Sequence, residues 1–78
     1  MEQDQINKIF LEAQLFNFMS LRSILKNNPL TAEQKDACNN AIIITAASID
    51  QLLAHNPELN NEVDKIGANL FYKETKNV

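Results

Sequence analysis

The segment that decides the fold is 41-AIIITAA-47, a run of seven residues without a charged side chain. It lies inside a longer segment, 31–55, that otherwise has the sequence features of a helix. Seven residues make about two helical turns, so apolar side chains point in every direction around this part of the helix. A helix that is apolar all round must be covered all round. Because the chain is short, we expect a second copy or another protein to supply some of that cover.

Composition favours a small, soluble, all-α protein. The chain has 78 residues with one Gly and two Pro, and 45 % of them are hydrophobic. This composition is typical neither of disordered chains nor of turn-rich β proteins, so we expect a single all-helical domain over residues 1–78. The start of the chain carries Glu2 and Asp4 instead of basic residues. No uncharged run approaches the roughly 18 residues of a membrane span, so we expect a cytoplasmic protein without a signal peptide or a membrane segment.

Three helices and two short connections account for nearly the whole chain. The segment 27-NNP-29 stops the first helix, because Asn tolerates the left-handed conformation after a helix and Pro cannot continue one. Thr31, with Gln34 three residues later, has the spacing of a capping box that starts the second helix. Asn56 and Pro57 are suited to cap and begin the third helix. The predicted helices cover about residues 4–26, 32–55 and 57–72, and we expect the tail, 73–78, to fray.

The short first connection predicts that the chain folds back on itself. We therefore expect a long antiparallel helical hairpin made of the first two helices, with the shorter third helix beside it. The third helix has one narrow apolar seam of Leu59, Val63, Ile66 and Leu70. This seam is enough for one contact with the hairpin.

The first two helices carry more apolar surface than a monomeric three-helix bundle needs. The first helix has two apolar stripes, roughly 150° apart around its axis. The second helix has a broad apolar face, with further apolar residues opposite it. One stripe of the first helix consists of Ile6, Ile9, Phe10, Ala13, Phe16 and Ile24, and the other consists of Leu11, Leu15, Phe18 and Leu25.

Two explanations fit the excess of apolar surface on the first two helices. Either the hairpin pairs with its own copy into a helical-bundle homodimer, or the extra stripe docks a different protein. We expect the homodimer, because symmetric dimers are the commonest oligomers and small all-α chains often complete their cores by assembly. The predicted protein interface, whether for self-assembly or for a partner, consists of Leu11, Leu15, Phe18, Ile43 and Ala47.

The chemistry-bearing residues predict no catalytic site, no metal site and no cofactor. His55 is the only histidine and sits where a helix end favours it, and Cys38 is the only cysteine, more than four turns away on the same helix. No His follows a Glu at the spacing of a bundle metal site. A single Gly excludes a glycine-rich phosphate loop.

These observations predict a small non-enzymatic protein that binds another protein as an adaptor, regulator or inhibitor. The alternative is a nucleic-acid-binding regulator of the helical-dimer type, which would use Lys8, Arg22 and Lys26 of the first helix. Seven basic and ten acidic residues give a net charge of −3, spread along the chain. This balance disfavours DNA or RNA as the partner.

Overall fold

The computed structural model describes residues 2–66, and this part of the chain is all-helical, as predicted. Helix α1 spans Gln3–Asn27 and helix α2 spans Ala32–His55. A short 3-10 turn, η1, covers Pro57–Leu59, and residues 60–66 continue as α-helix. The remainder of the predicted third helix and the predicted tail, 67–78, lie outside the described residues.

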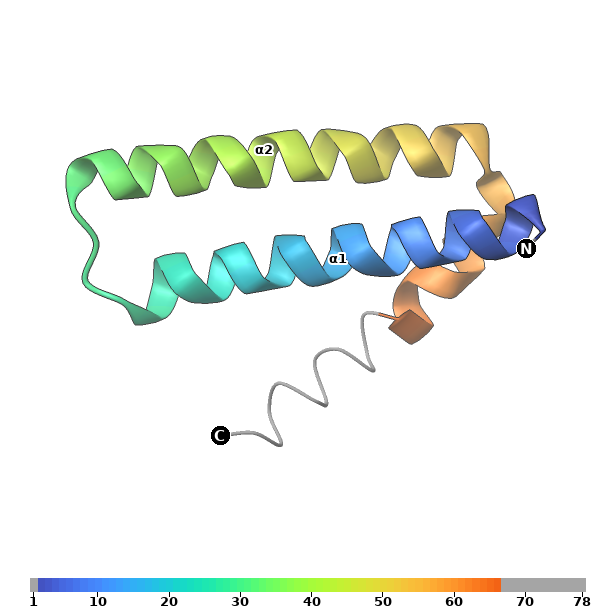
Figure 1. Cartoon of the computed structure of the whole chain (residues 1–78), viewed down its shortest axis with the longest axis horizontal. Coiled ribbons are helices and arrows are strands. Elements are labelled where there is room, and N and C mark those ends of the chain that lie inside the picture. The colour runs from blue at the N-terminus through green and yellow to red at the C-terminus, as the bar shows by residue number, and fades with distance from the viewer. Residues whose placement is uncertain (1, 67–78) are drawn as a thin grey trace.

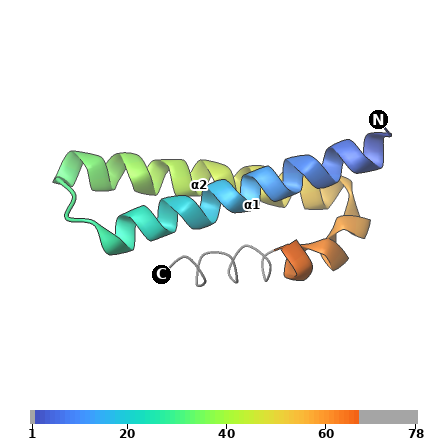
Figure 2. The same cartoon turned by 60° about the horizontal axis from the view of Figure 1, so that its bottom comes forward.

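The two long helices lie side by side over most of their length (Figure 1). The end of α1 and the start of α2 meet at one end of the molecule, where residues 28–31 connect them. We refer to residues 57–66 as the third segment. Figure 2 shows that the third segment turns back after α2. It contacts α1 through the core around Leu11 and through Lys8 and Glu62. It therefore covers part of one side of the α1–α2 pair, at the end where α1 begins and α2 ends.

Local polar contacts explain why the chain turns where it does between α1 and α2. The predicted capping box is confirmed: Gln34 N donates to Thr31 Oγ1 at 3.1 Å, and Thr31 N donates to Gln34 Oε1 at 3.0 Å. Asn28 corrects the expectation of a left-handed residue, because its φ of −129° and ψ of 144° are extended. The following Pro29 disfavours helical backbone at Asn28, and this restriction outweighs the tolerance of Asn for the left-handed region.

Asn56 acts differently from the cap that the sequence predicts. Its side chain makes no capping hydrogen bond to the turn that follows it. Instead, Asn56 Nδ2 donates to the carbonyl oxygen of Leu52 at 3.0 Å, and Asn56 Oδ1 accepts from Asn7 Nδ2 at 3.1 Å. The residue therefore closes the end of α2 and ties it to the start of α1.

The core lies where α1, α2 and the third segment meet. Its buried residues are Leu11, Ile49 and Leu59, with exposed fractions of 0 %, 8 % and 1 %. Each fully buried leucine contributes about 1.5–3 kcal/mol relative to an exposed one. Six partly buried residues pack around these three: Leu15, Phe18, Leu52, Leu53, Val63 and Ile66.

Candidate protein-binding surfaces

The five predicted interface residues divide into two groups in the structure. Leu11 is fully buried in the chain's own core, and Leu15 and Phe18 pack against it. Ile43 is 66 % exposed, and Ala47 is exposed on the same side of α2. Of the five, Ile43 and Ala47 are therefore exposed, Leu15 and Phe18 are partly buried, and Leu11 is fully buried.

Leu11 is buried within its own chain, and this burial has a direct structural cause. Leu59, Val63 and Ile66 of the third segment cover the stripe that contains Leu11. The other stripe of α1 faces away from this contact. Two stripes about 150° apart cannot both face the same neighbours, and the sequence alone did not show which one the third segment would select.

Large apolar side chains are exposed on both long helices. Each of them has an exposed fraction between 46 % and 66 %, well above that of a core residue. They are Ile9, Phe10, Phe16 and Ile24 on α1, and Ile43 and Ile44 on α2. Exposed apolar residues in such number on a small domain indicate contact surfaces.

One of these surfaces, the open face, lies on the side of the α1–α2 pair away from the third segment. A groove on this side is lined by Phe10 and Gln14 of α1 and by Ser48, Gln51 and His55 of α2. Residues spaced alternately three and four apart extend this face along both helices. The open face comprises Phe10, Gln14, Asn17, Leu21 and Ile24 of α1, and Ala41, Ile44, Ser48, Gln51 and His55 of α2.

The open face carries no Asp, Glu, Lys or Arg. Its three most apolar residues, Phe10, Ile24 and Ile44, have exposed fractions of 56 %, 46 % and 66 %. Water-facing helix surfaces normally carry charged side chains opposite the core. The absence of charge from this face therefore favours a buried role in an assembly.

A second pair of surfaces, the outer edges, lies where each helix faces away from the other. On α1 the edge is a shallow surface with Ile9, Ala13 and Phe16, beside Glu12. On α2, helical periodicity places Ile43 and Ala47 together on the edge. The outer edges are narrower than the open face, because each is formed by a single helix.

The two side chains with catalytic potential, Cys38 and His55, each form a hydrogen bond with a backbone carbonyl oxygen. Cys38 is 8 % exposed, and its Sγ donates to the carbonyl oxygen of Leu21 at 3.2 Å. His55 Nδ1 lies 2.8 Å from the carbonyl oxygen of Gln51, so that ring nitrogen carries the hydrogen and donates. Within residues 2–66, no three His, Cys, Asp or Glu side chains are grouped to hold a metal ion.

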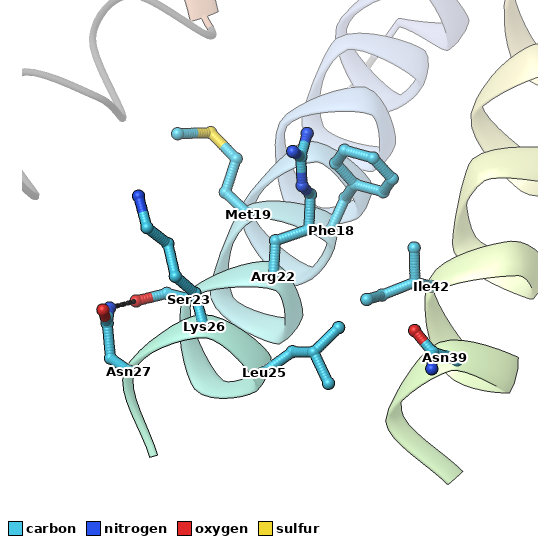
Figure 3. Close-up of a pocket in the computed structure, with 9 residues that line it drawn as sticks. All are labelled: Phe18, Met19, Arg22, Ser23, Leu25, Lys26, Asn27, Asn39 and Ile42. Carbon is cyan, nitrogen blue, oxygen red and sulfur yellow. Dashed lines mark hydrogen bonds between the residues drawn. The ribbon is translucent and has the colours of Figure 1, made fainter. Parts of the chain in front are cut away.

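A basic groove, with a volume of about 650 Å³, lies between the second half of α1 and the first half of α2. Figure 3 shows that Phe18, Met19 and Arg22 come from α1 and Ile42 from α2, with Met19 pointing away from Ile42. The guanidinium carbon of Arg22 lies 5.6 Å from the centre of the Phe18 ring, within cation–π range. Lys26 also lines the groove, so its charged residues are both basic.

The three basic residues of the nucleic-acid alternative do not act as one group. Arg22 and Lys26 share the basic groove, whereas Lys8 lies more than three turns away along α1. Lys8 Nζ is 3.8 Å from Glu62 Oε1 of the third segment, so its charge is partly balanced within the chain. This arrangement offers no continuous basic stripe to a phosphate backbone.

Helix α2 is also long and apolar enough, by length and composition alone, to cross a membrane. Only 6 % of its apolar window is buried within the chain. Helix α2 is therefore an apolar helix that its own chain leaves largely uncovered.

Comparisons with protein families, with curated proteins and with solved structures found no match to this chain.

Proposed function

We propose that this chain is a non-enzymatic, cytoplasmic protein-binding module whose working form is a homodimer. In this proposal α1 and α2 form a long antiparallel helical hairpin that pairs with its copy. The dimer then acts on another protein as an adaptor, regulator or inhibitor. The single observation that carries the proposal is the uncharged open face, with Phe10, Ile24 and Ile44 exposed on it.

The dimensions of the open face suit a dimer contact. A helix of 25 residues, the length of α1, is about 37 Å long at ~1.5 Å per residue. Two helices side by side are about 20 Å wide, so the face offers roughly 700 Å². Stable interfaces of ordinary size bury about 600–1,000 Å² on each partner. The open face lies within this range, near its lower end, if nearly all of it is used.

The chemistry of the open face suits contact with an identical copy. In a two-fold dimer the same patch occurs on both partners. A charged residue near the axis would therefore lie beside the same charge on the other copy and be repelled by it. The open face has no acidic or basic side chain apart from His55, at its end. The alternating spacing of three and four residues on both helices also suits packing of side chains between neighbouring helices.

The outer edge of α2 is the proposed surface for a different protein. Ile43 and Ala47 lie there, outside both the core and the open face. A partner helix packing on this edge would cover the part of 41–47 that the dimer leaves exposed. Asp50, also exposed and near the middle of the apolar part of α2, supports a protein partner over a membrane. A charged side chain at that depth in a bilayer costs at least about 2.5 kcal/mol.

Two neighbouring residues provide the test. Ile43 and Ile44 are both 66 % exposed, but Ile44 lies on the open face and Ile43 on the outer edge. We expect the native protein to have twice the 8.8 kDa mass of the chain in light scattering after size exclusion. Ile44→Glu should give the monomer mass, because it places an unpaired charge in a dry contact. Ile43→Glu should keep the dimer mass.

A monomer mass for the native protein across a dilution series would overturn the proposed dimer. A monomeric Ile43→Glu with a dimeric Ile44→Glu would move self-assembly to the outer edge. Binding to lipid vesicles by the native chain, lost in Ile43→Glu, would favour a membrane over a protein partner. Sub-micromolar binding to duplex DNA or RNA at about 150 mM salt would favour the nucleic-acid alternative.

A further inference from the structure

The basic groove has a local charge opposite to that of the whole chain. The chain has a net charge of −3, but residues 13–27 of α1 contain Arg22 and Lys26 and no Asp or Glu. Both cations line the groove, and none of its described lining residues is acidic. Arg22 and Lys26 are four residues apart, so they lie on the same side of the helix, one turn from each other. Because charges across a protein interface are complementary, this groove favours a partner that brings negative charge to it.

Apolar side chains form the floor of the basic groove. Figure 3 shows Phe18 and Leu25 of α1 and Ile42 of α2 directed into the space between the two helices. All three are partly buried, and Arg22 lies over the Phe18 ring. A partner that fits must therefore present apolar groups to the floor and carboxylates to the basic side chains. This combination disfavours duplex DNA or RNA, whose outer surface is a row of phosphates.

The third segment shows how the α1–α2 pair binds a helix. Its Leu59 lies in the core, and Glu62 Oε1 lies 3.8 Å from Lys8 Nζ. The pair thus accepts an apolar helix seam with an acidic residue beside it, and a basic residue of α1 meets that acid. Phe18 belongs both to the residues packed on this core and to the basic groove. The groove therefore continues the same packing surface along the two helices.

We propose that the basic groove binds an acidic, amphipathic helix of another protein. The apolar seam of that helix packs on Phe18, Leu25 and Ile42, and its carboxylates lie beside Arg22 and Lys26. The groove follows about three turns of α1, so the partner helix contributes one apolar residue per turn to the contact. The proposal rests on the proposed function only in that the chain binds proteins. It does not depend on the dimer, because the groove shares no residue with the open face or the outer edges.

The first test titrates the full native chain with a synthetic acidic helix. The probe is a peptide of about 18 residues, long enough to be helical, with Leu at every third or fourth position, Glu on both sides of that seam and Ala elsewhere. It should shift the methyl NMR signals of Leu25 and Ile42 and leave those of Ile9, near the start of α1, in place. A matched peptide with Lys in place of every Glu should bind about tenfold more weakly, because it loses two ion pairs. Unchanged signals of Ile42, or equal binding of the two peptides, would overturn the proposal.

The second test changes the charges of the groove. Lys26→Gln should weaken binding of the acidic peptide by about threefold, the usual effect of an exposed ion pair. Lys8→Gln is the matched control, because it makes the same change in net charge about five turns away along α1 and should keep the native affinity. With Arg22→Glu and Lys26→Glu combined, the preference should reverse in favour of the Lys peptide. Equal losses in Lys26→Gln and Lys8→Gln would indicate a general effect of charge and contradict the proposed site.

Other occupants of the groove would give different results. Methyl signals of Ile42 that shift on dilution of the native protein alone would overturn the proposal, by showing that a second copy fills the groove. Duplex DNA that shifts the same signals at a lower concentration than the acidic peptide would overturn it in favour of nucleic acid. The mass of each sample, measured in parallel, separates this proposal from the dimer. Peptide binding to a native monomer would refute the dimer and support the groove, whereas a native dimer that ignores the peptide would do the reverse.

Discussion

The two faces of α1 differ far more in the structure than they do in the sequence. The covered face, centred on Leu11, meets the third segment and has an exposed fraction of 0 % at that residue. The open face, only one residue away at Phe10, has an exposed fraction of 56 % there. Both faces carry apolar residues at helical spacing. The difference shows that the burial of an apolar stripe depends on which neighbouring segment packs against it.

The largest expected effect comes from emptying the covered face. Leu11→Ala should lower the free energy of unfolding by about 3 kcal/mol, because it leaves a cavity in a fully buried site. The measurement is chemical denaturation followed by circular dichroism. The matched variant is Phe10→Ala, which removes a larger side chain from the open face. At a concentration where the native protein is monomeric, Phe10→Ala should cost less than a third as much.

Equal losses in Leu11→Ala and Phe10→Ala, both measured on monomers, would contradict the distinction between a covered and an open face. A larger loss in Phe10→Ala would show that the third segment does not cover Leu11. The comparison must be repeated at high concentration, where the dimer adds the stability of association. The loss of stability in Phe10→Ala, relative to the native protein, should grow with protein concentration. The loss in Leu11→Ala should stay the same at every concentration.

The next largest effect is expected at the hydrogen bond between Asn7 and Asn56, which joins the start of α1 to the end of α2. Asn7→Ala should lower the free energy of unfolding by about 1 kcal/mol, because it removes the hydrogen bond to Asn56 across the end of the helix pair. Asn56 also donates to Leu52, so Asn56→Ala should cost more than Asn7→Ala. Thermal unfolding of both variants checks the order. Gln3→Ala is the control, since Gln3 bonds only within α1, to Asn7, on an exposed surface.

The smallest effect is expected at the ion pair between α1 and the third segment. The side chains of Lys8 and Glu62 are 54 % and 29 % exposed, and their charged atoms are 3.8 Å apart. Lys8→Ala should change the free energy of unfolding by less than about 0.5 kcal/mol, because water and salt screen exposed pairs. Comparison of unfolding at low and high salt measures it. A loss above about 1 kcal/mol that salt abolishes would show a stronger pair than this exposure allows.

The sequence predicted the features of the fold that depend on local chemistry. Thr31 and Gln34 form the expected capping box. Pro29 lies in the connection after α1, and Pro57 begins the 3-10 turn after α2. The all-helical class follows from apolar spacing with a single Gly. These features depend on residues within one or two turns of each other, so a pattern in the sequence is enough to identify them.

The sequence did not predict which apolar residues the chain buries within itself. Leu11, Leu15 and Phe18 were assigned to an interface, but the first is buried and the other two pack on it. Their burial depends on a contact with the third segment, more than 40 residues later in the chain. The absence of charge from Phe10 to Ile24 on one side of α1 was a signal available in the sequence. This uncharged side of α1 is part of the open face. It could be recognised as one face of a helix pair only once the position of α2 was known.

The central claim is that the open face is covered by a second copy of this chain, and the mass in solution tests it most directly. Light scattering after size exclusion should give a mass of twice 8.8 kDa for the native protein at micromolar concentration. Ile44→Glu should give a single mass of 8.8 kDa with its helical circular dichroism retained. A native mass of 8.8 kDa at every concentration would contradict the account, as would an Ile44→Glu variant that keeps the native dimer mass.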